Sequence, residues 1–215
     1  ETYATELRAT PAVLRFERDS PYTHGTEYVA SVYAEGGWPA VDALHANPPA
    51  SMEEVMHIGR EGILSVPERA TQAVHDLFED AMSGAAYEHA LGDDLGELGL
   101  LAFFDGVTGA TTMSEAADGW SGDFACVYAR DGAPDAAIWV SAWDSIRDAV
   151  EAFEAARQVA NRLTALGRRV RVERVQRALL ITFDVPEDLD EGLHQALTDY
   201  VFVHLAGPAA PEEEE

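Results

Sequence analysis

Two β-rich runs on either side of a turn sequence, in the second half of the chain, constrain the fold more than any other feature. The runs at 124–129 and 137–142 contain aromatic and β-branched residues, and the segment 131–134 between them reads Asp-Gly-Ala-Pro. A turn of this composition between two such runs predicts a β-hairpin. We therefore expect an antiparallel sheet that the later elements must join.

A long helix pattern and two more strands follow the hairpin. Ser145 and Asp148 have the spacing of a helix N-cap. The apolar stripe expected to face the core consists of Ile146, Val150, Phe153, Ala160 and Leu163. Strands are expected at 170–175 and 178–185, and a final helix at 189–205. This β-β-α-β-β-α order predicts an α+β fold, in which an antiparallel sheet of about four strands carries helices on one face.

The first half of the chain has the periodicity of helices. One helix is expected to end at Gly37, and a Ser-Met-Glu-Glu capping box begins another at Ser51. Residues 83–94 have neither helix nor strand pattern and are interpreted as a loop. These changes of pattern divide the chain into a mostly helical region at 1–112, an α+β module at 113–206 and an acidic flexible tail at 207–215.

The charge of the chain excludes two classes of partner. It has 39 acidic residues against 14 basic ones, all of them arginine, and a formal net charge of -25. Nucleic acids and anionic membrane surfaces are bound through cationic contacts, so neither is expected as a partner. The carboxylates are spread along the chain rather than concentrated in one segment. This favours adaptation to molar salt, where the Debye length of about 3 Å screens self-repulsion, as in a halophilic archaeon, over an acidic ligand site.

Common catalytic motifs are missing from the sequence. It contains no H-E-x-x-H zinc motif, no G-x-S-x-G nucleophile elbow and no Gly-rich nucleotide-binding loop. The His/carboxylate pairs spaced four apart are Glu53 with His57, His75 with Glu79, and His89 with Asp93. They are interpreted as surface hydrogen-bonding pairs rather than metal sites, and Cys126 as a buried, unreactive thiol. No catalytic, cofactor-binding or metal-ligating residue is assigned, and enzyme activity is left open.

Two groups of residues allow alternative interpretations. The aromatic group comprises Tyr22, Tyr28, Tyr33 and Trp38. These side chains could line a ligand groove, but their spacing favours packing in the core. The arginine group comprises Arg168, Arg169, Arg171, Arg174 and Arg177. Charge of this kind is typical of a sheet-edge strand that resists aggregation, and an anion or partner site is the alternative.

Short motifs between residues 20 and 155 resemble a known family. They include Pro21-Tyr22-Thr23-His24-Gly25, Gly36-Gly37-Trp38, Pro48-Pro49-Ala50-Ser51-Met52-Glu53 with His57, Leu95-Gly96-Glu97-Leu98-Gly99-Leu100, and Gly119-Trp120-Ser121-Gly122-Asp123. This series resembles the region that follows the catalytic region in bacterial and archaeal zinc-metallopeptidase-like proteins, which are typically secreted or lipid-anchored. The chain departs from the pattern after His57, where Ile58 and Gly59 replace the usual proline, and 156–215 match only in outline.

The resemblance implies a non-catalytic C-terminal portion of a halophilic cell-envelope protein. The metal-binding helix would precede Glu1, and zinc would be bound there rather than in this segment. Because the chain begins with Glu1 and not Met, we expect a removed leader or a longer polypeptide. The partner would be the missing N-terminal catalytic region or another protein, outside the cell or at its surface, with the cytoplasm as the alternative. The residues expected to contact a partner or substrate are Tyr22, His24, Trp38, His57 and Trp120.

A second hypothesis belongs to a different functional class. The chain would then be a stand-alone surface or assembly subunit with a structural or protein-interaction role and no enzyme activity. The absence of every catalytic motif considered above, in a sequence rich in packing signals, motivates this alternative.

Overall fold

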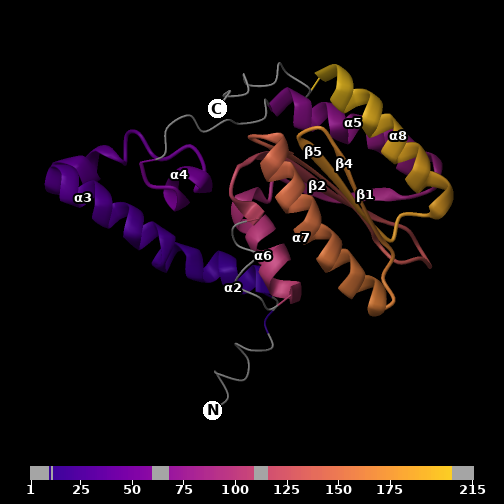
Figure 1. The fold of residues 1–215 in the computed structure, drawn as a ribbon, viewed down its shortest axis with the longest axis horizontal. Helices are drawn as coiled ribbons and strands as arrows, with labels where there is room; N and C mark the ends of the chain where they lie inside the picture. The colour runs from indigo at the N-terminus through magenta and orange to yellow at the C-terminus, as the bar shows by residue number, and fades with distance from the viewer. Residues whose placement is uncertain (1–9, 11, 60–67, 109–115, 205–215) are drawn as a thin grey trace, which may run out of the picture.

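In the computed structural model, which describes residues 10, 12–59, 68–108 and 116–204, an antiparallel sheet forms the centre of the molecule (Figure 1). Its five strands lie in the order β1-β2-β3-β5-β4. Their bounds are Glu88–Asp93 for β1, Trp120–Ala129 for β2, Ala136–Trp143 for β3, Val170–Val175 for β4 and Ala178–Phe183 for β5. Every neighbouring pair is antiparallel. The predicted α+β class is confirmed, as is the hairpin, whose turn contains Gly132 at a φ of 74°.

Strand β1 is an element that the sequence did not predict. Residues 83–94 were interpreted as a loop, but Glu88–Asp93 pairs with β2 along one edge of the sheet. Five of its six residues are exposed, and its register shifts between His89 and Leu91. The ring of His89 lies 5.6 Å from that of Tyr128 on β2, but backbone pairing is the main interaction of such a strand, because it has few apolar side chains to bury. This is why its sequence lacks the alternation of apolar and polar residues that predicts a strand.

The sheet is covered by helices on both faces, so the expectation of one covered face was wrong. Side chains of β3 alternate between two cores: Ile138 and Val140 contribute to one, and Trp139 and Trp143 to the other. The first core includes residues of α5 (Glu68–Gly84) and α8 (Glu187–His204), and the second includes residues of α6 (Gly96–Thr108) and α7 (Ile146–Ala165). The reason lies in the central strands, because β5 is apolar at nearly every position and needs cover on both sides.

Helix α7 begins at the predicted cap, and the face that it turns to the core overlaps the predicted stripe only in part. The Ser145 hydroxyl accepts a hydrogen bond from the Asp148 backbone N–H at 3.2 Å, which confirms the cap. Its buried residues are Ala149, Ala152, Ala155, Ala156, Val159 and Ala160. Of the predicted stripe, Ala160 is buried and Phe153 and Leu163 pack against this core, as expected. Ile146 and Val150 are 47% and 39% exposed, so that part of the stripe was wrong. Bulky Trp139 and Trp143 fill this core from the sheet side, and small residues let the helix approach them.

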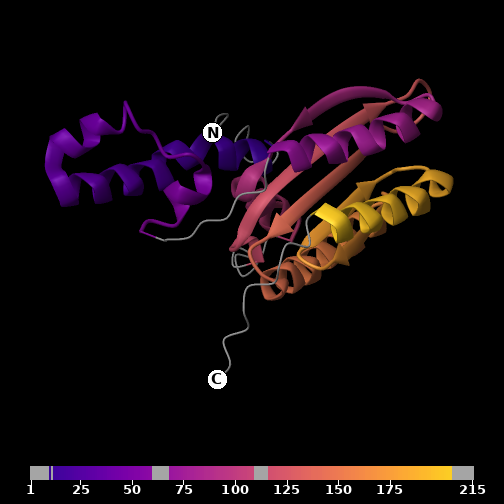
Figure 2. The ribbon, with the colours of Figure 1, turned by 90° about the horizontal axis from the view of Figure 1, so that it is seen from above.

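The N-terminal elements form an arm that projects from this body (Figures 1 and 2). The arm comprises α2 (Ala12–Asp19), the 3-10 turn η1 (Ser20–Tyr22), α3 (His24–Ala43) and α4 (Met52–Met56). Helix α2 contacts α6 of the body, and α4 lies beside both α3 and α6. The predicted helix end at Gly37 is a kink within α3, with a φ of 64° that only glycine adopts without strain. The Ser51 cap is also present, because its side chain accepts from the backbone N–H of Glu54 at 3.4 Å. The Glu54 carboxylate reaches back to the backbone N–H of Ala50 at 2.9 Å, one residue before the Ser51 N–H of the predicted capping box.

The arginine group lies on and beside the edge strand β4, as one of its two interpretations predicted. Arg168 forms an ion pair with Asp184, and Arg171 lies 3.3 Å from the carboxylate of Glu173. Arg177 donates to the backbone oxygens of Trp143 and Asp144 at 3.3 and 3.0 Å. Contacts within the chain thus hold these guanidinium groups. The division of the chain at residues 112 and 113 stays a prediction, and the tail at 207–215 lies outside the described residues.

The alanine face of α7 yields a stability prediction. Ala156→Leu should lower the free energy of unfolding by about 1–3 kcal/mol, because Ala156 is fully buried and the added methylenes must displace packed neighbours. Urea unfolding in molar salt would measure this. The control is Ile146→Ala on the same helix, which should change the value by less than about 0.5 kcal/mol. If the control is the more damaging variant, the predicted stripe was right and this packing is wrong.

Candidate functional site

A buried carboxylate, that of Asp123, joins the start of α6 to the sheet. Asp123 is 3% exposed and lies near the start of β2. Four N–H groups donate to its two oxygens: the backbone of Leu95 at 3.1 Å and Gly96 at 2.9 Å, and the indoles of Trp120 at 3.1 Å and Trp139 at 2.7 Å. The carboxylate thereby joins the first residues of α6 to strands β2 and β3.

The protonation state of Asp123 reflects two opposing effects. Burial raises the pKa of the carboxyl group above its usual value, and hydrogen bonds from Trp139, Gly96 and Leu95 reduce the rise without cancelling it. All four partners are donors, so the ionised form alone accepts every one of them. We infer that the fold needs the ionised carboxylate here. The free-energy cost of burying its charge offsets part of the stabilisation that the hydrogen bonds contribute.

Three side chains from separate segments meet beside this carboxylate, in a group that we call the His57 cluster. It consists of His57 at the end of α4, Glu97 in the first turn of α6 and Asp118 in the turn before β2. His57 Nε2 lies 2.7 Å from Glu97 Oε1 and 3.7 Å from Asp118 Oδ1. Glu97 is 2% exposed, whereas the Asp118 side chain is 56% exposed. The cluster thus runs from the interior to the solvent and combines one imidazole with two carboxylates.

Gly119 places Asp118 in this cluster. It has a φ of 84°, and a Cβ built on it would lie 2.7 Å from Cγ of Asp148. Its carbonyl oxygen accepts a hydrogen bond from the Asp144 backbone at 2.8 Å. A residue with a side chain would therefore disturb both the turn and the cap of α7. The turn at Gly119 thus positions Asp118, and the hydrogen bonds from Leu95 and Gly96 to Asp123 position Glu97.

The structure brings two of the five predicted contact residues to the His57 cluster and Asp123. His57 is in the cluster, and the Trp120 indole binds Asp123. His24 lines an open hollow of about 520 Å³ with Phe16 and Leu98, where the arm meets α6. Tyr22 and Trp38 lie elsewhere on the arm, 80% and 67% exposed. Whether these five residues contact a partner stays a prediction.

The sequence interpretation missed Glu97, Asp118 and Asp123. Glu97 and Asp123 belong to motifs that carried the family resemblance, so a signal existed, but nothing in their spacing joined them to His57. Glu53 was expected in a surface pair, yet it is 1% exposed. The structure describes the backbone of His75 but not its side chain, so the predicted pair with Glu79 stays a prediction.

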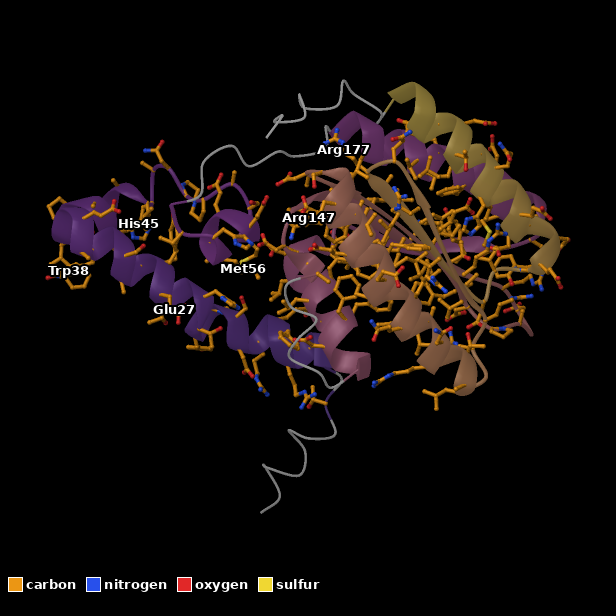
Figure 3. The ribbon with its side chains drawn as sticks, in the orientation of Figure 1. Glu27, Trp38, His45, Met56, Arg147 and Arg177 are labelled. Carbon is orange, nitrogen blue, oxygen red and sulfur yellow. The ribbon has the colours of Figure 1, made fainter. Side chains whose placement is uncertain are left out.

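The aromatic group does not pack in the core, which corrects the favoured interpretation. Tyr22, Tyr33 and Trp38 are 80%, 46% and 67% exposed. Tyr33 and Trp38 stack edge to face with ring centroids 5.0 Å apart. They stay exposed because α3 projects beyond the body and has no buried residue along its length. Figure 3 shows Trp38 at the far end of the arm.

Cys126 agrees with its predicted role. The thiol is buried, and burial raises its pKa to about 12. A thiol with this pKa is protonated at neutral pH and a poor nucleophile. It therefore offers no reactive group to the site.

A second polar group joins α8 to the sheet. His194 is buried, with Nδ1 2.6 Å from Glu173 Oε2 and Nε2 3.5 Å from Asp190 Oδ1. Asp190 accepts from the Thr182 hydroxyl at 2.6 Å and lies 3.6 Å from the Arg171 guanidinium. Burial raises the pKa of Asp190, but the contacts with His194, Thr182 and Arg171 outweigh burial and hold the pKa below its usual value.

The comparisons with known proteins now identify the family. A family model described as a domain of unknown function, DUF8575, matches residues 86–200. The chain belongs to the DUF8575 family. No curated protein and no solved structure matches the chain. Among the described helices, none is long and apolar enough to span a membrane.

The DUF8575 domain contains all five strands with α6, α7 and most of α8, but not the arm. Glu97, Asp118 and Asp123 therefore belong to the family domain, whereas His57 precedes it. The His57 cluster is a contact between the family domain and the segment attached to it.

Asp123→Asn should lower the free energy of unfolding by about 3 kcal/mol, because the amide NH₂ would face indole or backbone donors in a buried site. Urea unfolding in molar salt would measure the loss. Asp135→Asn, at an exposed position before β3, is the matched control and should be neutral. Equal effects of the two variants would contradict the organising role of Asp123.

Asp190→Asn should remove a contribution that depends on pH. Because the pKa of Asp190 is lowered in the folded state, its stabilisation is complete above the ordinary carboxyl pKa of about 4 and lost as pH falls through the lowered value. The variant should be less stable by about 2 kcal/mol at pH 7, and the difference should close below about pH 4. Urea unfolding at a series of pH values would measure it, with exposed Asp188→Asn as control. A gap independent of pH would contradict this account.

Proposed function

We propose that the chain is a non-catalytic, protein-binding portion of a halophilic cell-envelope protein, and that its arm is the docking surface. The observation that carries the proposal is α3, a helix of 20 residues with none buried. A helix in a folded domain normally buries an apolar face. A helix that projects without one is stabilised when another surface covers it.

The side chains exposed on the arm suit a protein interface. They include Tyr22, Val29, Tyr33 and Trp38, each at least 38% exposed. Tyrosine and tryptophan are enriched in interfaces because they bury a large apolar area and lose few rotamers. The edge-to-face pair of Tyr33 and Trp38 gives this surface a preformed centre.

The charge of α3 indicates what the partner should offer. The helix carries Glu27, Glu35 and Asp42 but no arginine. A complementary surface would be apolar at its centre, where it covers Trp38, and carry arginine at its rim. The family model matches residues 86–200 and leaves out the arm. This supports an arm that is added to the DUF8575 domain for docking.

The motif resemblance supports one particular partner for the exposed surface of the arm. In a metallopeptidase-like protein the arm would pack against the catalytic helices that precede this segment, outside the cell or at its surface. The activity and any catalytic zinc would belong to those helices. The alternative is an assembly subunit whose arm packs against a second copy or another envelope protein, which the same aromatic surface would serve.

A photo-crosslinking experiment tests docking by the arm. A benzophenone amino acid at position 38, in the full polypeptide in its own cells at molar salt, should give several-fold more product than one at Leu166. Leu166 is the control because it is 77% exposed at the end of α7, on the domain.

The crosslinked partner distinguishes the hypotheses. A product with a segment upstream in the same polypeptide supports the metallopeptidase-like assignment. A product with a second copy or another envelope protein supports the assembly subunit. Equal yields at positions 38 and 166 would overturn the docking proposal.

A further inference from the structure

We propose that His57, Glu97 and Asp118 bind one divalent transition-metal ion of the Zn²⁺ class. Their ligand atoms come from α4, α6 and the turn before β2, and all lie within 4.8 Å of one another. Within the part of the chain that the structure describes, no other set of three His, Cys, Asp or Glu side chains meets this spacing. The site goes beyond the docking function and does not rest on it.

The distances suit an ion between the three side chains. Zinc binds histidine nitrogen and carboxylate oxygen at about 2.0–2.2 Å in tetrahedral geometry. Two ligand atoms of such a site are therefore about 3.3–3.6 Å apart. The observed separations from His57 Nε2, 2.7 Å to Glu97 and 3.7 Å to Asp118, lie on either side of this value. Small side-chain rotations would bring both onto it.

Charge favours a cation at this place. Glu97 is 2% exposed, and an ionised carboxylate so deep in a protein needs opposite charge or several hydrogen bonds. Two carboxylates and a neutral imidazole carry a charge of -2, which a divalent ion balances. Glu53, buried one helical turn before His57, adds a further carboxylate to α4.

The donor set selects among cations. Mg²⁺ and Ca²⁺ prefer oxygen ligands alone, whereas imidazole is a common ligand of zinc and its neighbours in the first transition row. The Asp118 side chain is 56% exposed and that of His57 23% exposed, so water can reach the ion and complete its coordination. The cluster therefore suits a zinc-like ion with one open position.

The surrounding structure would hold the ligands in place. Asp123 fixes the backbone of Leu95 and Gly96 directly before Glu97, and through Trp120 it supports the turn that carries Asp118. Such outer-shell contacts orient ligands and raise metal affinity. His57, at the end of α4, completes the set from the arm.

A bound ion would tie the arm to the DUF8575 domain. Helix α4 has five residues and little apolar surface of its own. One ion shared between His57 and two domain carboxylates would fix where α4 sits on α6. Removing the ion would loosen this attachment while leaving the two cores on either side of the sheet intact.

The test is a zinc titration of the full chain after treatment with a chelator and dialysis into molar KCl. Calorimetry with ZnCl₂ in excess Mg²⁺ should show one site per chain, and metal analysis after dialysis should find one zinc. Asp118→Asn and His57→Gln should each weaken binding at least about tenfold. His45→Gln, which changes an exposed histidine of the arm (Figure 3), should leave the affinity unchanged.

Both outcomes are informative because Asp118 is exposed and its substitution leaves the packing intact. Circular dichroism should show Asp118→Asn folded as the parent protein. Zinc that binds equally well to the parent, Asp118→Asn and His57→Gln would be held elsewhere by surface carboxylates, which overturns the proposal. Failure to retain zinc also overturns it and assigns the cluster to a direct hydrogen bond between His57 and Glu97.

Discussion

The hydrogen bonds from four N–H groups to Asp123 are the interaction on which the candidate site depends. They connect α6, β2 and β3 through one carboxylate and set the positions of Glu97 and Asp118. The charge is balanced by neutral dipoles rather than by an arginine in contact with it. Buried hydrogen bonds of this kind are little affected by salt, whereas surface ion pairs are screened. For a chain with a net charge of -25, a neutral donor shell is a means of organisation that molar salt leaves intact.

Elements specified by local sequence were predictable, and elements specified by distant partners were not. The hairpin, the Ser145 cap and the break at Gly37 depend on a few adjacent residues, and all three are present. Strand β1 depends on backbone pairing with β2, which its own residues do not encode. The face that α7 buries is set by the tryptophans of β3, so its own apolar residues predict only part of that face: Ala160 is buried, whereas Ile146 and Val150 are exposed.

The candidate site shows the same contrast between features set by local sequence and features set by distant residues. His57 was singled out from its motif, but its neighbours Glu97 and Asp118 come from other parts of the chain. Only the fold brings them together, through a turn at Gly119 and a helix start held by Asp123. The prediction for the aromatic residues of the arm was wrong for a different reason. Their helical spacing is the same whether their face of the helix packs in the core or stays exposed. The sequence identified these residues, and only the structure shows that the described part of the chain leaves them exposed.

The two edges of the sheet limit how the molecule can associate. One edge, β1, is mostly polar and irregular in register, and the other, β4, carries arginine and glutamate side chains. Edges of this kind resist the addition of a further strand from another chain. Growth by β-augmentation, the route by which many extended peptides are captured, is therefore disfavoured on both sides. Any partner would therefore have to be recognised through the shape and chemistry of side chains, and neither edge is a good template for fibrils.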